Sequence, residues 1–308
     1  MSKSKKEKLR LICKLPPGDV MTLTVAIESL HKQYPDTYLT GVKSLHPAIF
    51  HANPNVVRME NGKDVRDIEM HYHDIQDSNQ RSVSFINAYT SHLSKELGIP
   101  ITPVSNRPVL YLEDTEKSWI SQVQEVTGKK TPFWVVNAGI KRDFTAKSWP
   151  IEHYQEVVNR TLGKIQWVQI GAKEDGHPKL DGVIDLREKT DIRQLIRLVF
   201  HSSGGLGPVT FLQHLCAAWD KPYICLLGGR EPAQWVQYPL QHTLSTLGLL
   251  SCCRKTACWK SRVVQLSDGK EQDNSICEYP VLGMKRPSAK CMTSITPEAV
   301  LEILSRIC

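Results

Sequence analysis

The hydrophobic residues of this chain form short runs that alternate with longer amphipathic stretches. The run at 9–15 is closed by Pro-Pro-Gly, which predicts a buried strand followed by a sharp turn. Residues 19–35 then carry apolar side chains at three-and-four spacing, and this period predicts a helix that Pro35 ends. The chain therefore opens with a strand, a loop and a helix.

The alternation continues through both halves of the chain. In the first half we predict strands at 37–44, 53–60 and 67–75 and helices at 82–97 and 114–127. In the second half we predict strands at 132–139, 165–172, 182–187 and 222–229 and helices at 151–163, 191–202, 210–220 and 296–307. Strands that alternate with helices are typical of parallel sheets with crossover helices, so the fold class is α/β.

The length of 308 residues exceeds the usual size of one compact domain. We therefore predict two α/β lobes, residues 1–130 and 131–308, which face a central cleft. After residue 246 the alternation gives way to polar segments, and residues 251–292 form a cysteine-rich insert in the second lobe.

Composition places the chain among ordinary globular proteins, and no run of eighteen or more apolar residues predicts membrane insertion. The basic start lacks the apolar stretch of a secretory signal, so we expect a cytoplasmic protein. The net charge is +7, and its densest part is the segment with Lys3, Lys5, Lys6, Lys8 and Arg10. This segment is either a solvated tail or a surface that binds the phosphates of a nucleotide or nucleic acid.

Five of the nine cysteines fall within one short region: Cys252, Cys253, Cys258, Cys277 and Cys291. In a reducing cytoplasm such a group favours a metal site over disulfides. Four thiolates from two short loops can close a tetrahedral site for zinc or iron, and this structural metal would staple polar segments that have little apolar surface. Cys252 and Cys253 compete for the first ligand position. Free thiols and a catalytic cysteine are the alternatives.

Two predicted strand-to-helix junctions carry charged residues, and the carboxyl ends of parallel strands are where open α/β sheets bind ligands. At the first junction, Gly18 permits a close approach and Asp19 is either a plain helix N-cap or a catalytic carboxylate. At the second, Lys141, Arg142 and Lys147 follow a buried strand, where they are either solvated surface residues or a binding site for a diphosphate.

A third junction places small residues and a hydroxyl group at the start of the predicted helix 210–220. Thr210 suits a phosphate contact there, whereas His214 within the helix is more often structural. None of the three junctions decides the function singly.

Together, five motifs occur in an order that resembles glycosyltransferase family 9, the heptosyltransferase-like group of GT-B enzymes. They read PPGDV, DFTAKSWP, GPVTFLQHLCAAW, KPYICLLGGREPAQW and HTLSTLGLLSCCRKTACWKSRV. The resemblance extends from about Leu9 to Ile307, and the cysteine-bearing insert is similar to that of bacterial autotransporter heptosyltransferases. It implies two Rossmann-like lobes of GT-B type.

The resemblance also implies roles for single residues. Asp19 matches the general base, Lys147 the lysine that contacts the donor diphosphate, and Thr210 with His214 the motif that frames the nucleotide. Further residues implied on the nucleotide-sugar side are Gly18, Lys141, Arg230 and Glu231. The better known heptosyltransferases have Asp-Thr-Gly where this chain has Val209, Thr210 and Phe211, so the specificity for the sugar is open.

The implied activity is inverting transfer of a heptose from ADP-heptose to a hydroxyl group on a protein or saccharide. Transfer to a DNA base and a non-catalytic, nucleotide-binding relative are the alternatives. The resemblance to enzymes with such an insert implies that the structural metal is iron. The sequence has no Asp-x-Asp motif to bind a catalytic divalent metal, so we expect none. His73, Asn79 and Arg81 are candidates for the acceptor side, or part of an exposed polar loop. The sequence also leaves open whether the chain forms a homo-oligomer.

Overall fold

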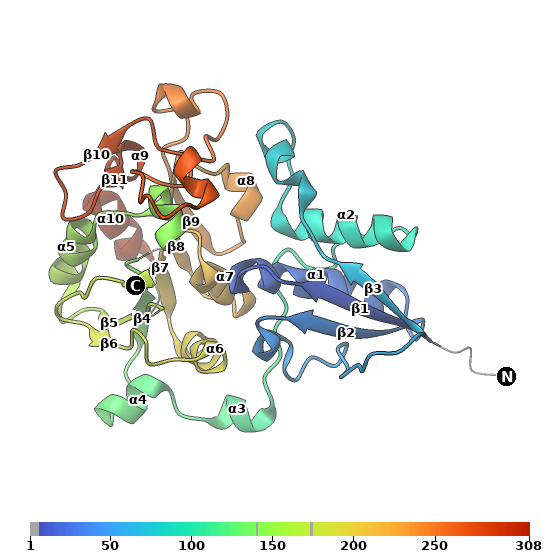
Figure 1. Ribbon diagram of the computed structural model, residues 1–308. Helices are drawn as coiled ribbons and strands as arrows, with labels where there is room; N and C mark the ends of the chain where they lie inside the picture. The colour runs from blue at the N-terminus through green and yellow to red at the C-terminus, as the bar shows by residue number, and fades with distance from the viewer. Residues whose placement is uncertain (1–5, 140, 173–174) are drawn as a thin grey trace. The chain divides into compact units, whose positions relative to one another are not determined.

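The computed structural model describes residues 6–139, 141–172 and 175–308 (Figure 1). These residues form two compact units, 1–119 and 120–308, which are called unit 1 and unit 2. The sequence predicts a boundary after residue 130. None of the described helices is long and apolar enough to cross a membrane.

Unit 1 is built on a parallel sheet with the strand order β2-β1-β3. Its strands are β1 (Glu7–Cys13), β2 (Tyr38–Ser44) and β3 (Val65–Glu69), and its helices are α1 (Pro17–Gln33), α2 (Phe85–Leu97), α3 (Asp114–Ser118) and the 3₁₀ helices η1 (Pro47–Phe50) and η2 (His73–Asn79). The central strand β1 supplies the fully buried side chains of Leu9 and Leu11. The helices α1 and α2 pack against each other.

Three expectations for unit 1 are wrong in detail. The segment 53–60 forms a single bridge, between Val56 and Thr40, because half of its side chains are exposed and do not bury a strand face. The strand predicted at 67–75 ends at Glu69. The helix predicted at 114–127 is interrupted, since Ser121 accepts a hydrogen bond from the backbone N–H of Gln124 and so starts a new helix.

Unit 2 contains a parallel six-stranded sheet with the order β6-β5-β4-β7-β8-β9. The strands are β4 (Phe133–Val136), β5 (Gln166–Gln169), β6 (Ile184–Asp185), β7 (Gly204–Gly207), β8 (Tyr223–Gly228) and β9 (Gln241–Ser245). The chain winds outward in both directions from the pair β4 and β7, as in doubly wound nucleotide-binding folds.

Helices cover both faces of this sheet: α5 and α10 lie on one face, α6 and α7 on the other (Figure 1). The helical bounds are α4 (Gln122–Thr127), η3 (Arg142–Lys147), α5 (Ile151–Thr161), α6 (Ile192–His201), α7 (Phe211–Ala218), α8 (Ala233–Val236), η5 (Ser251–Cys253), η6 (Glu271–Asn274), α9 (Lys290–Thr293) and α10 (Pro297–Ile307). The antiparallel pair β10 (Pro280–Val281) and β11 (Ser288–Ala289) belongs to the predicted insert.

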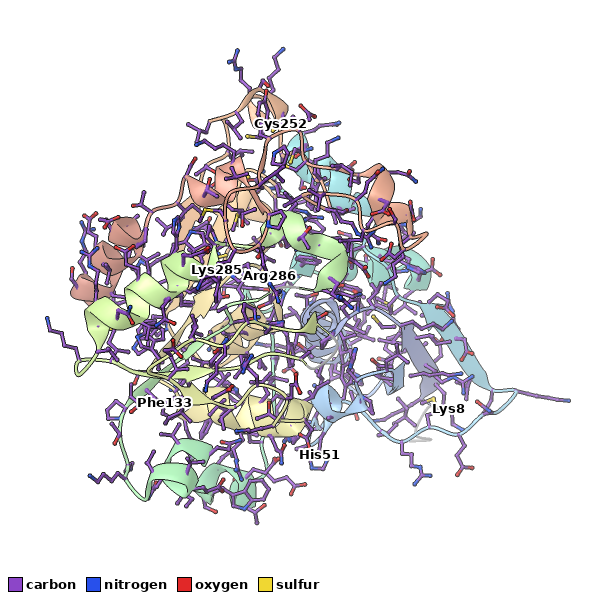
Figure 2. The ribbon with its side chains drawn as sticks, turned by 60° about the vertical axis from the view of Figure 1, so that its left-hand side comes forward. Lys8, His51, Phe133, Cys252, Lys285 and Arg286 are labelled. Carbon is purple, nitrogen blue, oxygen red and sulfur yellow. The ribbon has the colours of Figure 1, made fainter. Side chains whose placement is uncertain are left out.

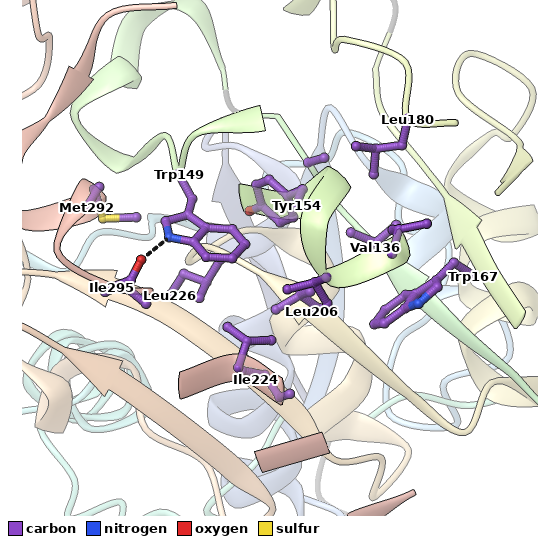
Figure 3. Close-up of a cluster of buried hydrophobic side chains, with 14 of the residues drawn as sticks. Val136, Trp149, Tyr154, Trp167, Leu180, Leu206, Ile224, Leu226, Met292 and Ile295 are labelled. Atoms are coloured by element: carbon purple, nitrogen blue, oxygen red, sulfur yellow. Dashed lines mark hydrogen bonds between the residues drawn. The ribbon is translucent and has the colours of Figure 1, made fainter. Parts of the chain in front are cut away.

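The core of unit 2 combines aliphatic side chains with the large rings of Trp149, Tyr154 and Trp167 (Figure 3). The indole of Trp149 is 1% exposed, and its Nε1–H donates to the carbonyl oxygen of Ile295 at 2.9 Å. This bond joins the start of α5 to the turn between α9 and α10. It thereby satisfies a polar group that would be costly to bury alone.

The strand β7 has little side-chain volume, and the ring of Trp134 occupies the space over Gly204. A Cβ atom added at Gly204 would lie 2.6 Å from the Trp134 indole. We expect Gly204→Ala to lower the free energy of unfolding by about 1–3 kcal/mol, because overpacking displaces neighbouring core groups. Urea denaturation followed by tryptophan fluorescence measures the change.

Gly283→Ala is the matched control, since an added Cβ there meets nothing within 4 Å. Equal stability of the two variants would contradict the packing of Trp134 on β7.

Candidate active site

The carboxyl ends of β4 and β7 meet at the point where the winding of the unit 2 sheet reverses. Asn137 follows β4, and its Nδ2 donates to Oγ1 of Thr210 at 3.1 Å. Its backbone N–H donates to the carbonyl oxygen of Leu206. Thr210 is the N-cap residue of α7. Open α/β sheets bind ligands at such a reversal point.

A charged cluster lies beside this point. Nζ of Lys147 is 2.5 Å from Oε1 of Glu231, and Arg230 also pairs with Glu231. Lys147 comes from η3, and Arg230 and Glu231 come from the loop after β8. The cluster therefore joins the second predicted junction to that loop. The guanidinium of Arg230 lies over the rings of Phe144 and Trp259, at 5.3 and 5.6 Å.

Burial and neighbouring charges shift the pKa of Glu231 in opposite directions. Burial would raise the pKa of its carboxyl group, but the charges of Lys147 and Arg230 outweigh this effect and lower the pKa below its ordinary value. Glu231 is therefore ionised, and its partners are held in place by a buried carboxylate.

His214 is 2% exposed and lies one turn into α7. Its Nδ1 and the hydroxyl of Tyr238 form a hydrogen bond of 2.7 Å. Burial, with a smaller contribution from the charge of Lys147, lowers the pKa of His214 to about 3. The imidazole is therefore neutral and cannot supply positive charge to a ligand.

The segment 258–263 runs between the two loops that carry the cluster. On one side, the backbone N–H of Trp259 donates to the carbonyl oxygen of Arg230, and Nε of Arg230 donates to the carbonyl oxygen of Lys260. On the other side, the N–H of Val263 donates to Oγ1 of Thr145 in η3. The loops after β4 and β8 are therefore connected through a segment from the predicted insert.

Arg262 anchors this segment. Its side chain has no exposed surface, and it pairs with Asp143 at 2.9 Å, Asp268 at 2.7 Å and Asp273. Asp143 also forms ion pairs with Lys270 at 3.0 Å and Lys141 at 4.0 Å. Lys141, a candidate for donor binding, is thus partly neutralised by Asp143.

A cavity of about 660 Å³ adjoins η3 within unit 2. Its lining carries charges of both signs, from Arg142, Lys270, Arg286, Asp175 and Asp268. The backbone N–H of Lys285 donates to Glu152 in the first turn of α5, which fixes the neighbouring Arg286 near that turn (Figure 2). The volume is in the range of small-ligand pockets.

Asp19 lies in the first turn of α1 in unit 1. The expectation that it is the N-cap is wrong: Pro16 is the N-cap and Pro17 the first helical residue, where its fixed φ favours a helix start. Gly18 is the second residue of the helix. The hydroxyl of Tyr72 donates to Oδ2 of Asp19 at 3.2 Å.

The ring of Tyr72 is held edge-on against Phe85 and Tyr89, with centroids 5.1 and 5.5 Å away. Burial, together with the charges of Cys13 and Asp19, raises the pKa of Tyr89 well above its ordinary value. The carboxyl group of Asp19 therefore borders an aromatic, largely neutral wall.

The three acceptor-side candidates lie in or just after η2. His73 and Asn79 are its first and last residues. Arg81 pairs with Asp77 at 2.8 Å and Asp74 at 3.1 Å, so its charge is already compensated.

The basic start of the chain is also ion-paired where it is described. Lys6 pairs with Asp36, Lys8 with Asp64 and Arg10 with Asp67, at 2.6, 2.8 and 2.7 Å. Lys3 and Lys5 lie outside the described residues. The part of the tail that is described does not present a row of unpaired cations to a polyanion.

The five cysteines of the predicted insert are free thiols of unit 2, and Figure 2 labels Cys252. Cys253 in η5 and Cys291 in α9 are buried, and the other three are partly exposed. Burial, followed by the neighbouring thiols of Cys258 and Cys253, raises the pKa of Cys252 to about 12. Burial likewise raises the pKa of Cys291 to about 11, and thiols at 258, 277 and 253 add to it. The thiols therefore lie within electrostatic reach of one another.

The chemistry of this donor set suits a thiolate-bound metal. Backbone N–H groups of Lys260, Tyr279 and Gly229 donate to the sulfur atoms of Cys258, Cys277 and Cys291, and each bond counteracts the rise in pKa. Such bonds stabilise thiolate ligands. However, no three of these sulfur atoms lie within 4.8 Å of one another. Among the described residues, the one group of three or more ligand atoms that meets this distance is His51, Glu113 and Glu116.

Sequence reasoning missed several residues of the site. Asn137 had a usable signal, because it is a polar residue directly after a buried strand. Tyr238 and the Arg262 network had none, since their partners come from distant segments whose contacts only the folded chain defines.

The profile of glycosyltransferase family 9 (heptosyltransferase) matches residues 73–262. The chain belongs to this family. It is a glycosyltransferase with an α/β, GT-B-like fold. None of the curated proteins matches the sequence.

Solved structures of related folds match this glycosyltransferase over nearly its full length. ADP-heptose LPS heptosyltransferase II of E. coli has a TM-score of 0.62 and 15% identity, covering 97% of this chain and 98% of that one. A family 9 glycosyltransferase of Veillonella parvula has a TM-score of 0.69 and 13% identity, covering 99% of both chains. The iron-containing dodecameric glycosyltransferase TibC of enterotoxigenic E. coli has a TM-score of 0.65 and 15% identity, covering 98% of this chain and 78% of that one.

The buried pair of Glu231 with Lys147 and Arg230 predicts a large effect of Glu231→Gln. We expect this glycosyltransferase to lose about 3 kcal/mol of unfolding free energy at neutral pH, because two cations lose a buried partner. The loss should be full above the ordinary glutamate pKa of 4.5 and should shrink as the pH falls through the lower pKa of the folded state.

Urea denaturation across a pH series measures this effect. Glu278→Gln is the control, since that carboxylate is half exposed and lies 3.8 Å from Lys260. Its loss should stay below about 1 kcal/mol. A pH-independent loss in Glu231→Gln would show that the pair does not stabilise the fold through charge.

Proposed function

We propose that this glycosyltransferase moves a heptose from ADP-heptose to an acceptor hydroxyl group with inversion at the anomeric carbon. The observation that carries the proposal is the cluster of Lys147, Arg230 and Glu231 beside the reversal point of the sheet, in a chain of family 9. Among the similar structures, heptosyltransferase II of E. coli is an ADP-heptose enzyme, and TibC is known in complex with ADP-D-β-D-heptose. Both support the choice of donor.

Asp19 is the proposed general base. Its carboxylate takes the proton of the acceptor hydroxyl while that oxygen forms the new bond to the anomeric carbon. The hydroxyl of Tyr72 donates to Oδ2 and orients the carboxylate. Tyr72 itself is positioned by Phe85 and Tyr89.

The residues of unit 2 are proposed to receive the leaving group. As the bond between the sugar and the diphosphate breaks, its electron pair stays on the diphosphate oxygen, and the charge of Lys147 stabilises it. Glu231 holds Lys147 in place before the donor binds, and Arg230 keeps Glu231 ionised when Lys147 turns to the diphosphate. The neutral His214 and Thr210 provide hydrogen bonds rather than charge.

The acceptor is proposed to be a hydroxyl group on a protein or saccharide rather than on DNA. Arg81 and the described cations of the basic start are already paired with carboxylates. A nucleic-acid surface needs cations that are available to phosphates. His73 and Asn79 can instead form hydrogen bonds with a hydroxyl-rich acceptor.

Cys253, Cys258, Cys277 and Cys291 are proposed to hold a structural iron or zinc, with Cys252 as the competing first ligand. When bound, the metal crosslinks the loops after β9 and supplies no step of the reaction. Its place matters for the donor site, because Cys258 begins the segment 258–263 that connects the loops after β4 and β8. TibC is an iron-containing enzyme, which supports iron over zinc.

The base is tested by Asp19→Asn. We expect kcat for release of ADP from ADP-heptose to fall by about 10²- to 10⁴-fold, because proton removal loses its acceptor. The KM for the donor should change little, since Asp19 belongs to unit 1. A coupled assay for ADP, run with a panel of nucleotide sugars, gives both constants and identifies the donor.

Asp64→Asn is the matched control, as this exposed carboxylate pairs with Lys8 on the surface of the same unit. Full turnover in Asp19→Asn would remove Asp19 as the base. Release of nucleoside diphosphate from other sugars but not from ADP-heptose would overturn the choice of donor.

The structural metal is tested by elemental analysis after anaerobic purification. We expect about one iron or zinc per chain, and less than half of that in Cys277→Ser, because four thiolates close the site. Cys308→Ser is the control, since this exposed thiol lies at the end of α10. Equal metal content in both variants, or none in the unaltered protein, would refute the site.

A further inference from the structure

Three histidines of unit 1 lie together beside the candidate base. His71 follows β3, His73 begins η2 and His92 belongs to α2. Their ring centroids are 5.1 Å apart for His71 and His73, 6.0 Å for His71 and His92, and 5.6 Å for His73 and His92. The proposed reaction uses His73 at most as a polar contact, so the cluster has no role so far.

The ring of His92 is fixed in one tautomer. Its Nε2 lies 2.8 Å from the carbonyl oxygen of Glu69, and a carbonyl oxygen only accepts, so Nε2 carries the hydrogen. In the neutral ring Nδ1 then bears the lone pair. A histidine that donates one ring N–H to a backbone carbonyl and keeps the other nitrogen as a lone-pair donor is the usual arrangement of a metal ligand.

The spacing of the rings suits a shared metal ion. With metal–nitrogen distances of 2.0–2.1 Å, three imidazoles on a tetrahedral ion have their ring centroids about 5 Å apart. In this structure the rings pack tilted or edge-on, and their nitrogen atoms do not all lie within 4.8 Å of one another. His71 and His73 are exposed and can turn within nanoseconds, whereas His92 is anchored by Glu69.

We propose that His71, His73 and His92 bind a divalent transition metal of the Zn²⁺, Co²⁺ or Ni²⁺ type. Three neutral nitrogen ligands favour these ions over Mg²⁺ and Ca²⁺, which prefer oxygen. Three protein ligands also leave a coordination position for water or for an oxygen of a bound molecule.

A metal bound by the three histidines would affect the orientation of the Asp19 carboxylate through Tyr72. Tyr72 lies between His71 and His73 in the chain, and its hydroxyl donates to Asp19. A metal that joins the two histidines to α2 fixes the backbone on both sides of Tyr72, and so fixes the orientation of the carboxylate. This consequence rests on the proposed function, whereas metal binding itself does not.

Titration of the full chain with Co²⁺ tests the site, because Co²⁺ takes the same ligands as Zn²⁺ and has visible absorption bands. We expect His73→Gln and His92→Gln to lose about one Co²⁺ per chain, or to bind it at least about 100-fold more weakly than the unaltered protein. The difference spectrum should show the visible bands without sulfur-to-metal charge transfer, which separates this site from the cysteines. Circular dichroism verifies that the variants are folded.

His51→Gln is the matched control, since His51 with Glu113 and Glu116 forms the competing group of ligand atoms in unit 1. It should bind Co²⁺ as the unaltered protein does. Unchanged Co²⁺ binding in both His73→Gln and His92→Gln, or loss of the metal in His51→Gln alone, overturns the proposal. Because no donor is present, these outcomes are independent of whether Asp19 is the base.

Discussion

The charged cluster proposed to bind the donor depends on one buried cation, Arg262. Its guanidinium has no exposed surface and joins Asp143 of η3 to Asp268 and Asp273. Separating a buried charge from its partners is costly, so the ion pairs hold these four residues together. The chain on either side of Arg262 is therefore pinned to η3, the 3₁₀ helix that carries Lys147.

The same constraint explains why a cysteine-bearing segment lies against the charged cluster. Within residues 258–263, Val263 packs into the core of unit 2, and hydrogen bonds to Arg230 on one side and to η3 on the other hold the rest. Such bonds contribute about 1 kcal/mol each, and the ion pairs of Arg262 add to them. The proposed metal would crosslink the same segment, because Cys258 is its first residue.

The sequence predicted most of the regular elements and the general location of the site, but not its pairings. Apolar runs identified β4, β5 and β8, whereas β7 escaped because Gly204–Gly207 has a single apolar side chain, and β9 because it is largely polar. Lys147 and Glu231 come together, as do Asn137 and Thr210, because the carboxyl ends of parallel strands lie at one edge of a sheet. Lys147 pairs with Glu231, which lies 84 residues further along the chain, and no local sequence pattern predicts such a pairing.

The pairing of Lys147 with Glu231 reconciles a largely buried lysine with the proposed binding of a diphosphate. An unpaired lysine in a largely buried position would lose its proton or turn toward solvent. Glu231 prevents both, and Arg230 compensates Glu231 in turn, so the three residues keep a net charge of one positive unit. A diphosphate carries more negative charge than one carboxylate and can therefore compete for Lys147. When it does, Arg230 still neutralises Glu231, and the exchange leaves no isolated charge inside the protein.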